Sequence, residues 1–365
     1  MPGLSCGIIG LPNVGKSTLF NALTKAGAAV ANYPFCTIEP NVGIVPVRDS
    51  RVDRLAALVH VSRIIYSTVE YVDVAGLVKG ASHGEGKGNE FLDHVRNCDA
   101  LVHVVRCFED PDVAHVTDNL DPVDDMRTIN LELMLADLQT AEAAHSRLAK
   151  QVRNEPEFKA TVAALEKVMA HLGGEKPVRT LHVSEPEAKL VNTFRFLTAK
   201  RVLYVANVDE AGLAGDAHGR VAAVRSFAES EGSAVVPICG KIEEEIAHLS
   251  EAEARPFLDD LGLTEAGLQR LVHATFRLLG LISYFTFNEQ EARAWTIRHG
   301  STAVEAAGVI HTDFAKHFIR AEVTAFDDFE RLGGPKGAHE KGLTRTEGKE
   351  YVVKDGDVVY FRIGP

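Results

Sequence analysis

The chain has 365 residues, of which 45% are hydrophobic and 25% charged, and its formal net charge is −12 at pH 7. This length and composition predict a globular protein of two or three domains with a sizeable core. The excess of acidic residues argues against sequence-independent binding of nucleic acid over the whole protein surface, because such binding needs many Lys and Arg contacts to phosphate. A local basic patch is still compatible with this net charge.

Targeting and redox signals are absent from the sequence. It shows no charged-then-apolar leader and no apolar run of membrane-spanning length, so we expect neither secretion nor membrane insertion, and the cytoplasm is the default location. The five cysteines are widely spaced without a C-x-x-C pair, which argues against a zinc site and a disulfide framework. We expect them to be reduced and mostly buried.

The first motif is GLPNVGKS at residues 10–17. An apolar segment, 6–9, precedes it and a helix-like run, 15–26, follows it, so the order is strand, glycine-rich turn, helix. Gly10 and Gly15 allow the backbone N–H groups to surround a β-phosphate at the positive end of the new helix. The motif therefore predicts a phosphate-binding loop.

Two side chains of this loop have expected roles toward a bound nucleotide. Lys16 would reach the β- and γ-phosphates, and the Ser17 hydroxyl would coordinate a Mg²⁺ ion that bridges them. The other nucleotide contacts expected from the loop are those of Asn13, Val14, Gly15 and Thr18.

A second motif, D-x-x-G at residues 73–76, follows a predicted strand at 68–72. Asp73 would hold a magnesium-bound water, and the Gly76 N–H would bond the γ-phosphate. Thr37 lies between the first helix and the next predicted strand, at 42–47, where a switch threonine closes on the magnesium ion, although a single threonine is more often a turn hydroxyl.

The glycine-rich segment 76–88 is predicted to be a switch loop that senses the γ-phosphate, with a passive surface loop as the alternative. Leu77 occupies the place where small GTPases often carry a water-orienting glutamine, so we expect slow intrinsic turnover until a partner orders this loop. Candidate water-activating groups in this loop are His83 and Glu85. A third candidate is His103 on a predicted strand at 100–105, which is alternatively a packed core residue.

The base-reading segment follows a predicted strand at 201–206 and has the sequence NVDE at 207–210, where guanine-specific relatives carry N-K-x-D. Val208 replaces the lysine, and Glu210 replaces an aspartate that accepts from guanine N1 and N2. Loss of this aspartate contact to guanine N1 and N2 favours ATP over GTP. After a further strand at 234–238, backbone groups would complete the base contacts, so the expected base-side residues are Asn207, Val208, Glu210, Gly240 and Lys241.

Between these motifs, residues 127–200 show helical periodicity. Leu131, Leu135 and Leu138 form one stripe, and a second stripe within 158–172 stops at a glycine pair. We expect two helices that pack as a hairpin inserted in the nucleotide domain.

Beyond residue 280 the pattern changes to short strands, at 295–298, at 318–323 and in a hairpin that joins 351–353 to 358–361. A short helix is expected after Ser301. Basic side chains there would form an RNA-facing surface or be scattered surface charge: Arg293, Arg298, His299, Lys316, Arg320, Lys336, Lys341 and Arg345.

The order of these motifs resembles the YchF family of Obg-like, ribosome-binding ATPases, which are P-loop proteins related to translation factors. The resemblance covers essentially the whole chain. Besides the phosphate loop, it rests on NYPFCTIEPN at 32–41, GEGKGN at 84–89, HVVRCF at 103–108 and the stretch 281–313.

The resemblance implies an α/β fold: a P-loop NTPase domain of the G-protein type at 1–126 and 201–280, a helical coiled-coil insertion at 127–200 and a C-terminal β-grasp (TGS) domain at 281–365. It implies a Mg²⁺-dependent ATPase switch whose TGS and helical domains contact the ribosome or ribosomal RNA. Asn13 resembles an asparagine that holds K⁺ in potassium-dependent relatives. We expect a monomer. A GTPase of the Obg type, or a nucleotide-regulated binding protein with negligible turnover, stays open.

Overall fold

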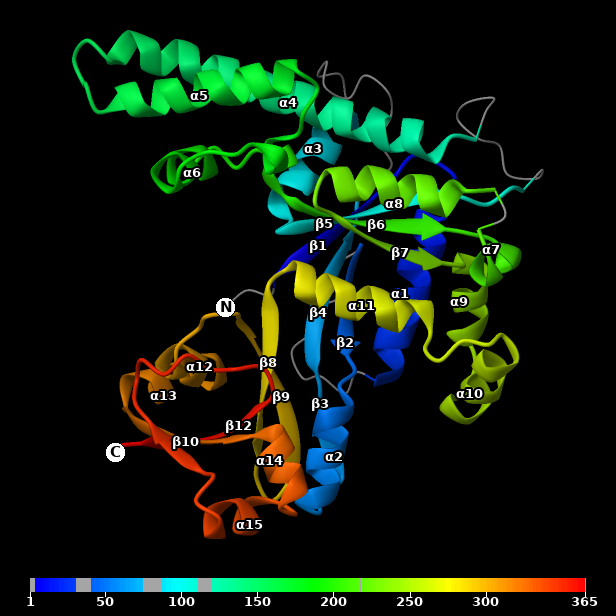
Figure 1. Ribbon diagram of the computed structural model, residues 1–365, viewed down its shortest axis with the longest axis vertical. Helices are drawn as coiled ribbons and strands as arrows, with labels where there is room; N and C mark the ends of the chain where they lie inside the picture. The colour runs from blue at the N-terminus through cyan, green and yellow to red at the C-terminus, as the bar shows by residue number, and fades with distance from the viewer. Residues whose placement is uncertain (1–3, 31–40, 75–86, 111–119, 217, 365) are drawn as a thin grey trace. The chain divides into compact units, whose positions relative to one another are not determined.

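The computed structural model describes residues 4–30, 41–74, 87–110, 120–216 and 218–364 (Figure 1). Contacts divide the chain into two compact units, each built from separate stretches of sequence. The main unit contains the described residues of Leu4–Gly43 and Glu70–Leu271, and the C-terminal unit contains those of Ile44–Val69 and Val272–Pro365.

The main unit is built on a six-stranded sheet with the order β2-β4-β1-β5-β6-β7. Strand β1 pairs in parallel with β4 and β5, and β6 pairs in parallel with β5 and β7. All seven residues of β5 are buried, as expected for a central strand of a parallel sheet. The strands are β1 (Ser5–Ile9), β2 (Val42–Val47), β4 (Ser67–Asp73), β5 (Ala100–Arg106), β6 (Arg201–Asn207) and β7 (Ala234–Ile238).

These strands confirm the sequence prediction with ends that agree to within one residue, and β2 and β7 match it exactly as predicted. The loops that follow the parallel strands lie at one edge of the sheet, where ligands bind in open α/β folds. Around the sheet and its loops lie α1 (Lys16–Val30), α3 (Lys87–Asn97), α7 (Glu210–Ala214), α8 (Arg220–Ser230), α9 (Gly240–Ile246), α10 (Glu251–Asp260) and the start of α11 (Gly267–Leu278).

A helical insertion leaves this sheet after β5 and returns to it at β6. Its elements are α4 (Pro122–Gln151), α5 (Phe158–Gly173), the short 3₁₀ turns η2 (Val178–Thr180) and η3 (Leu197–Ala199), and α6 (Glu185–Asn192). Asp121 caps α4 by accepting hydrogen bonds from the backbone N–H groups of Val123 and Asp124. Gly174 ends α5, as the glycine pair predicts. In Figure 1, α4 and α5 run side by side away from the sheet.

The interface between α4 and α5 follows only part of the predicted leucine stripe. Met134 and Leu148 of α4 are buried in this interface, and Leu138 packs against it. Leu131, in contrast, is 45% exposed, so the stripe prediction is wrong at its first position. The first turns of α4, where Met126 is fully buried, contact β5 and α8, and Leu131 lies on another side of the helix.

Asp137 fastens α4 to the turn that precedes β6. The residue is 2% exposed, and its carboxylate accepts hydrogen bonds from Leu197 N at 2.7 Å, Thr198 N at 2.8 Å and Thr198 Oγ1 at 2.6 Å. Burial raises the pKa of this carboxyl group, against the opposing effect of the three hydrogen bonds. The donors need this acceptor, because unpaired N–H groups are costly inside a protein.

The C-terminal unit contains a second sheet, with the order β11-β10-β12-β8-β9-β3. A cluster around α12 covers one face of this sheet and a cluster around α2 and α14 covers the other. The strands are β3 (Arg63–Ile65), β8 (Leu281–Phe287), β9 (Glu291–Arg298), β10 (Phe318–Ala325), β11 (Arg345–Glu347) and β12 (Asp357–Ile363). The helices are α2 (Ser50–Leu58), α12 (Ala303–Ile310), α13 (Thr312–Lys316), α14 (Phe326–Arg331) and α15 (Pro335–Glu340).

The predicted hairpin between 351–353 and 358–361 is wrong. Strand β12 pairs instead with β10 and β8, and Val352 forms only an isolated bridge to Thr302. The intervening turn is held differently, because the Asp357 carboxylate accepts from the backbone N–H of Lys354 at 2.9 Å. That contact closes a local turn and leaves β12 available to its longer partner β10.

Two expectations from composition concern cysteines and membrane spans. Cys6, Cys98, Cys107 and Cys239 are buried and not joined in disulfides. Among the described helices, none combines the length and the apolarity that crossing a membrane requires.

We predict that Asp137→Ala lowers the free energy of unfolding by roughly 2–4 kcal/mol, since it leaves buried N–H donors unpaired. Urea unfolding monitored by circular dichroism measures the change. The matched control is Glu142→Ala at an exposed position of the same helix, expected to cost less than about 0.5 kcal/mol. Equal losses in the two variants would contradict the role given to Asp137.

Candidate nucleotide-binding site

The phosphate-loop motif forms a tight turn between β1 and α1. Asn13 and Gly15 adopt left-handed backbone conformations, with φ of 63° and 90°. A Cβ atom at Gly10 would lie 2.8 Å from the carbonyl oxygen of Val104, so the turn approaches β5 more closely than a side chain permits. No acidic side chain lies in the first turn of α1. The loop thus presents a helix N-terminus suited to an anion.

The first two motifs meet in an ion pair between Lys16 and Asp73. The Lys16 Nζ lies 2.7 Å from Asp73 Oδ1, and the two side chains are 11% and 19% exposed. Strand pairing brings them together, because Ile8 of β1 is in register with Asp73 of β4. The predicted phosphate-binding lysine and the predicted magnesium-side carboxylate therefore belong to one site.

Asn207, at the end of β6, joins the phosphate loop to the segment after β7. Its Nδ2 donates to the carbonyl of Val14 at 2.8 Å, and its Oδ1 accepts from the backbone N–H of Gly240 at 3.0 Å. The side chain packs so closely that a Cβ at Gly15 would lie 2.2 Å from Nδ2. Three loops that are distant in sequence are thereby held at one edge of the sheet.

A cavity of about 1030 Å³ opens between these loops. It brings together all the predicted nucleotide contacts of the phosphate loop and of the base side except Val14, whose carbonyl is engaged by Asn207. The predicted residues on its wall are Asn13, Gly15, Lys16, Ser17, Thr18, Asn207, Val208, Glu210, Gly240 and Lys241.

Comparison with known proteins agrees with this architecture. Residues 5–139 match the family model described as 50S ribosome-binding GTPase, and residues 281–364 match the YchF-GTPase_C model, described as a protein of unknown function (DUF933). A Haemophilus ducreyi protein named ribosome-binding ATPase YchF is 52% identical over 361 residues, covering 99% of both chains. The chain belongs to the YchF family.

Other members of the YchF family show the same full-length agreement. The Bacillus subtilis protein, also named ribosome-binding ATPase YchF, is 51% identical over 363 residues, covering 98% of this chain and 99% of its own. The solved structure of the Schizosaccharomyces pombe YchF GTPase has 35% sequence identity and a TM-score of 0.89, covering 99% of each chain. The fold is therefore shared along the whole length.

On the base side, this YchF family member differs chemically from the N-K-x-D pattern. Val208 is 3% exposed and its backbone N–H donates to Ile238 at 2.8 Å, so an apolar side chain sits where the pattern has a lysine. Glu210 is exposed at the start of α7, and Asp209 caps this helix by accepting from Gly212 N at 2.8 Å. The cavity wall at this end therefore offers carboxylates and an apolar patch.

The structure adds cavity residues that the motifs did not indicate. Phe108, Glu109 and Asp110 follow β5, and their place after a parallel strand was the available signal. No local sequence pattern indicated that residues of α9 and α10 line the cavity, because only the packing of these helices brings them close to it. The added residues of these two helices and the turn after them are Ile242, Glu244, Glu245, Phe257 and Leu261.

The remaining predicted site residues divide into two groups. Thr37, Gly76, His83 and Glu85 lie outside the described residues. His103 is 1% exposed on β5, and its ring centroid lies 5.2 Å from that of Tyr204. Burial lowers the pKa of His103 to about 3, so the ring is neutral at neutral pH in the core of the sheet.

The oxygen donors near Lys16 fit a magnesium ion. Ser17 lines the cavity with a hydroxyl, and Asp73 provides a carboxylate beside Lys16. Hydroxyl, carboxylate and phosphate oxygens are the ligands that Mg²⁺ prefers, with several waters retained. This donor set therefore suits the metal that the two motifs predict.

We predict that Gly15→Ala destabilises the protein by roughly 2 kcal/mol or more, because the new methyl group would collide with Asn207 at an unfavourable φ. The matched control is Gly232→Ala, where φ is 68° but no atom lies within 4 Å of the added Cβ. That variant should lose only about 1 kcal/mol through backbone strain. Thermal unfolding compares the two, and equal losses would refute the close contact.

Proposed function

We propose that this protein is a Mg²⁺-dependent ATPase that acts as a ribosome-associated switch. The observation that carries the proposal is the Asn207 amide, which joins the phosphate loop to the base-side segment around one cavity. Relatives named ribosome-binding ATPase align over 98–99% of the chain, which supports the same activity here. A cytoplasmic monomer fits this role.

The phosphate side would work by charge neutralisation and positioning. Backbone N–H groups of residues 10–17 would surround the β-phosphate, and Lys16 would exchange its bond with Asp73 for the β- and γ-phosphate oxygens. Mg²⁺, held by Ser17, Thr37 and a water on Asp73, would supply electrostatic stabilisation of the transferred phosphoryl group. Asn13 is the candidate contact for K⁺.

The catalytic rate would depend on a partner. Gly76 would sense the γ-phosphate, and Leu77 provides no group that orients the attacking water. His83 and Glu85 in the same loop are the candidates to assist, since His103 is packed in the core. A low intrinsic rate that rises when a partner orders the loop follows from this arrangement.

Base choice is the point on which the relatives' names differ, because the bacterial proteins are named ATPase and the yeast structure is named a GTPase. Val208 and Glu210 favour adenine in this chain. Adenine has an amino donor at position 6, where guanine has a carbonyl, and adenine has no N2 amine. It therefore does not need the aspartate that accepts from guanine N1 and N2. A GTPase is the second candidate function.

We predict that the wild-type protein binds ATP more tightly than GTP and that Val208→Lys with Glu210→Asp shifts the preference toward GTP. Equilibrium titration of non-hydrolysable analogues with Mg²⁺ measures both affinities. The single variant Glu210→Gln, which removes the carboxylate but restores no aspartate, serves as the control. Tighter GTP binding by the wild type would refute the ATPase proposal, and binding of neither nucleotide would favour a vestigial site.

Charge is distributed unevenly between the two units. The C-terminal unit has 16 Lys and Arg against 15 Asp and Glu, whereas the main unit has 23 against 36. Phosphate-rich RNA is repelled less by the C-terminal unit. We therefore assign the ribosomal contact mainly to the C-terminal unit. Its residues 281–365, which we take as a β-grasp (TGS) domain, carry 11 Lys and Arg against 13 Asp and Glu. The helical insertion at 127–200 would assist, and the nucleotide domain would comprise 1–126 and 201–280.

We predict slow ATP hydrolysis by the protein alone and a severalfold or greater increase with ribosomes, because ribosome contact would order the switch loop. Phosphate release measures the rate. Lys16→Ala should lose at least about 100-fold in both conditions, and removal of Mg²⁺ should have the same effect. Wild-type turnover equal to that of Lys16→Ala would leave a nucleotide-regulated binding protein instead.

A further inference from the structure

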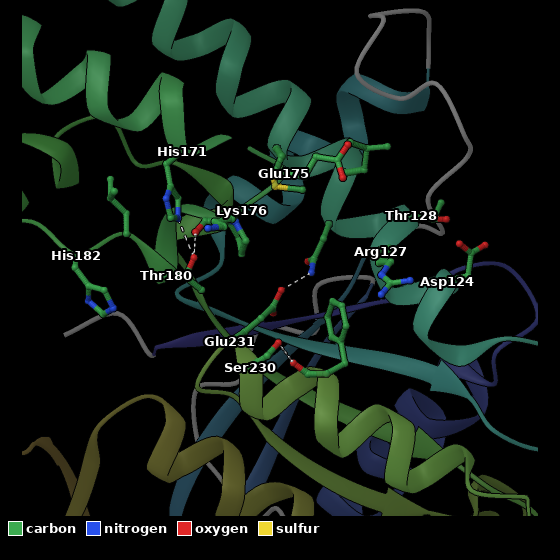
Figure 2. Close-up of a pocket in the computed structure, with 16 residues that line it drawn as sticks. Asp124, Arg127, Thr128, His171, Glu175, Lys176, Thr180, His182, Ser230 and Glu231 are labelled. Atoms are coloured by element: carbon green, nitrogen blue, oxygen red, sulfur yellow. Dashed lines mark hydrogen bonds between the residues drawn. The ribbon is translucent and has the colours of Figure 1, made fainter. Parts of the chain in front are cut away.

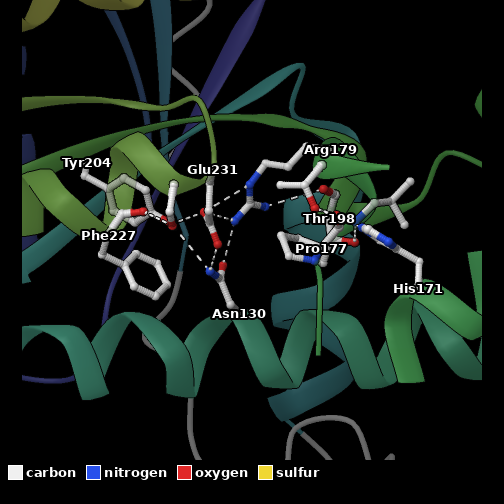
Figure 3. A network of polar contacts seen from close by, with 11 residues as sticks. Asn130, His171, Pro177, Arg179, Thr198, Tyr204, Phe227 and Glu231 are labelled. Atoms are coloured by element: carbon white, nitrogen blue, oxygen red, sulfur yellow. Dashed lines mark hydrogen bonds and ion pairs between the residues drawn. The ribbon is translucent and has the colours of Figure 1, made fainter. Parts of the chain in front are cut away.

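Four buried polar side chains form a closed cluster between the helical insertion and the main sheet, which we call the strand clamp (Figure 3). Asn130 comes from α4, Arg179 from η2, Tyr204 from β6, and Glu231 follows the last residue of α8. Asn130 and Tyr204 are 4% and 0% exposed, and the side chains of Arg179 and Glu231 are 7% and 8% exposed.

Within the strand clamp, Glu231 is the central acceptor. It accepts from Arg179 Nη2 at 2.7 Å, from Tyr204 Oη at 2.9 Å and from Asn130 Nδ2 at 3.0 Å. Asn130 Oδ1 in turn accepts from Arg179 Nη2 at 3.0 Å. Both carboxylate oxygens and both ends of the amide are therefore engaged. A satisfied buried network of this kind holds its members in one arrangement.

Two members of the strand clamp also face a cavity of about 770 Å³, whose lining includes Glu231 (Figure 2). Asn130 and Glu231 line this cavity together with the exposed Leu131. Because the polar groups of Asn130 and Glu231 already bond within the clamp, they have little to offer a ligand in that space. The network is better suited to hold elements in place than to bind a molecule.

The elements that the strand clamp holds lead directly to the base side of the nucleotide site. Tyr204 precedes Asn207 by three residues on β6. Glu231 precedes the start of β7 by three residues, and β7 ends just before Cys239 and Gly240. The base-side segments follow β6 and β7. The clamp thus links β6 and the residue shortly before β7 to Asn130 and Arg179, which both belong to the helical insertion.

We infer that Asn130 and Arg179 are positioning residues for nucleotide-base recognition. They keep β6 and β7 in the alignment that lets Asn207 bond Gly240 and present Val208 and Glu210 to the base. The described side chains expected to contact phosphate and Mg²⁺ lie on α1 and β4, and the clamp reaches the phosphate loop only through the bond from Asn207 to Val14. The helical insertion therefore affects recognition of the base more than it affects the phosphoryl-transfer groups. This inference rests on the proposed nucleotide function.

The test is the double variant Arg179→Met with Glu231→Gln, which removes both charges so that neither is left buried without a partner. We expect the Kd for ATP to rise about three- to tenfold and the ratio of GTP to ATP Kd to move toward one. The kcat at saturating ATP should change by less than about twofold, because the phosphate groups are untouched. Titration of fluorescent ATP and GTP analogues and phosphate release measure these quantities.

The matched control is Lys167→Met, which removes an exposed ion pair with Glu187 at 2.6 Å in the same insertion and should leave both Kd values unchanged. Tyr204→Phe, which loses only one donor to Glu231, is the milder variant if the double variant does not fold, and it should shift the Kd ratio in the same direction. Circular dichroism and thermal unfolding establish that each variant is folded.

The outcomes separate the two proposals. A wild-type protein that binds no nucleotide would overturn the proposed function and this inference together. Wild-type binding with an unchanged Kd ratio in folded clamp variants would overturn the clamp inference alone. Equal weakening of ATP and GTP would also overturn it, because it would show a general structural role without an effect on base recognition.

Discussion

The amide of Asn207 is the contact on which the nucleotide site depends. A parallel sheet brings the loops after its strands to one edge, but it does not by itself fix their separation. Asn207 does so by donating to Val14 and accepting from Gly240, and the absence of a side chain at Gly15 makes that approach possible. The predicted phosphate loop and the predicted base-side segment consequently meet at one side chain.

Buried polar groups in the main unit act in the same way at other places. Asp137 holds the turn before β6, and Glu231 holds β6 and the approach to β7. Such groups contribute little net stability compared with apolar packing, but they penalise any arrangement that leaves them unpaired. The helical insertion is thus attached by specific acceptors to the strands that lead to the candidate site.

Local sequence patterns were misleading where a long-range partner competed with them. Leu131 continues a leucine stripe, yet the start of α4 contacts β5 and α8, and this residue lies on another side of the helix. Residues 351–353 and 358–361 flank a turn, yet β10 offers β12 a longer antiparallel partner. His103, which the sequence analysis considered as a water-activating group or a core residue, is packed against Tyr204. In each case the outcome depended on a neighbour distant in sequence.

The sequence alone determined the strands of the main sheet and the glycine turn between β1 and α1, because apolar runs and glycine turns act over a few residues. It also indicated the family through the order of its motifs. Only the tertiary structure decided that Phe108 and Phe257 line the cavity, that α2 and β3 join the C-terminal unit, and that Arg179 reaches Glu231. These contacts depend on how helices and strands pack in three dimensions, and no local pattern of residues encodes them.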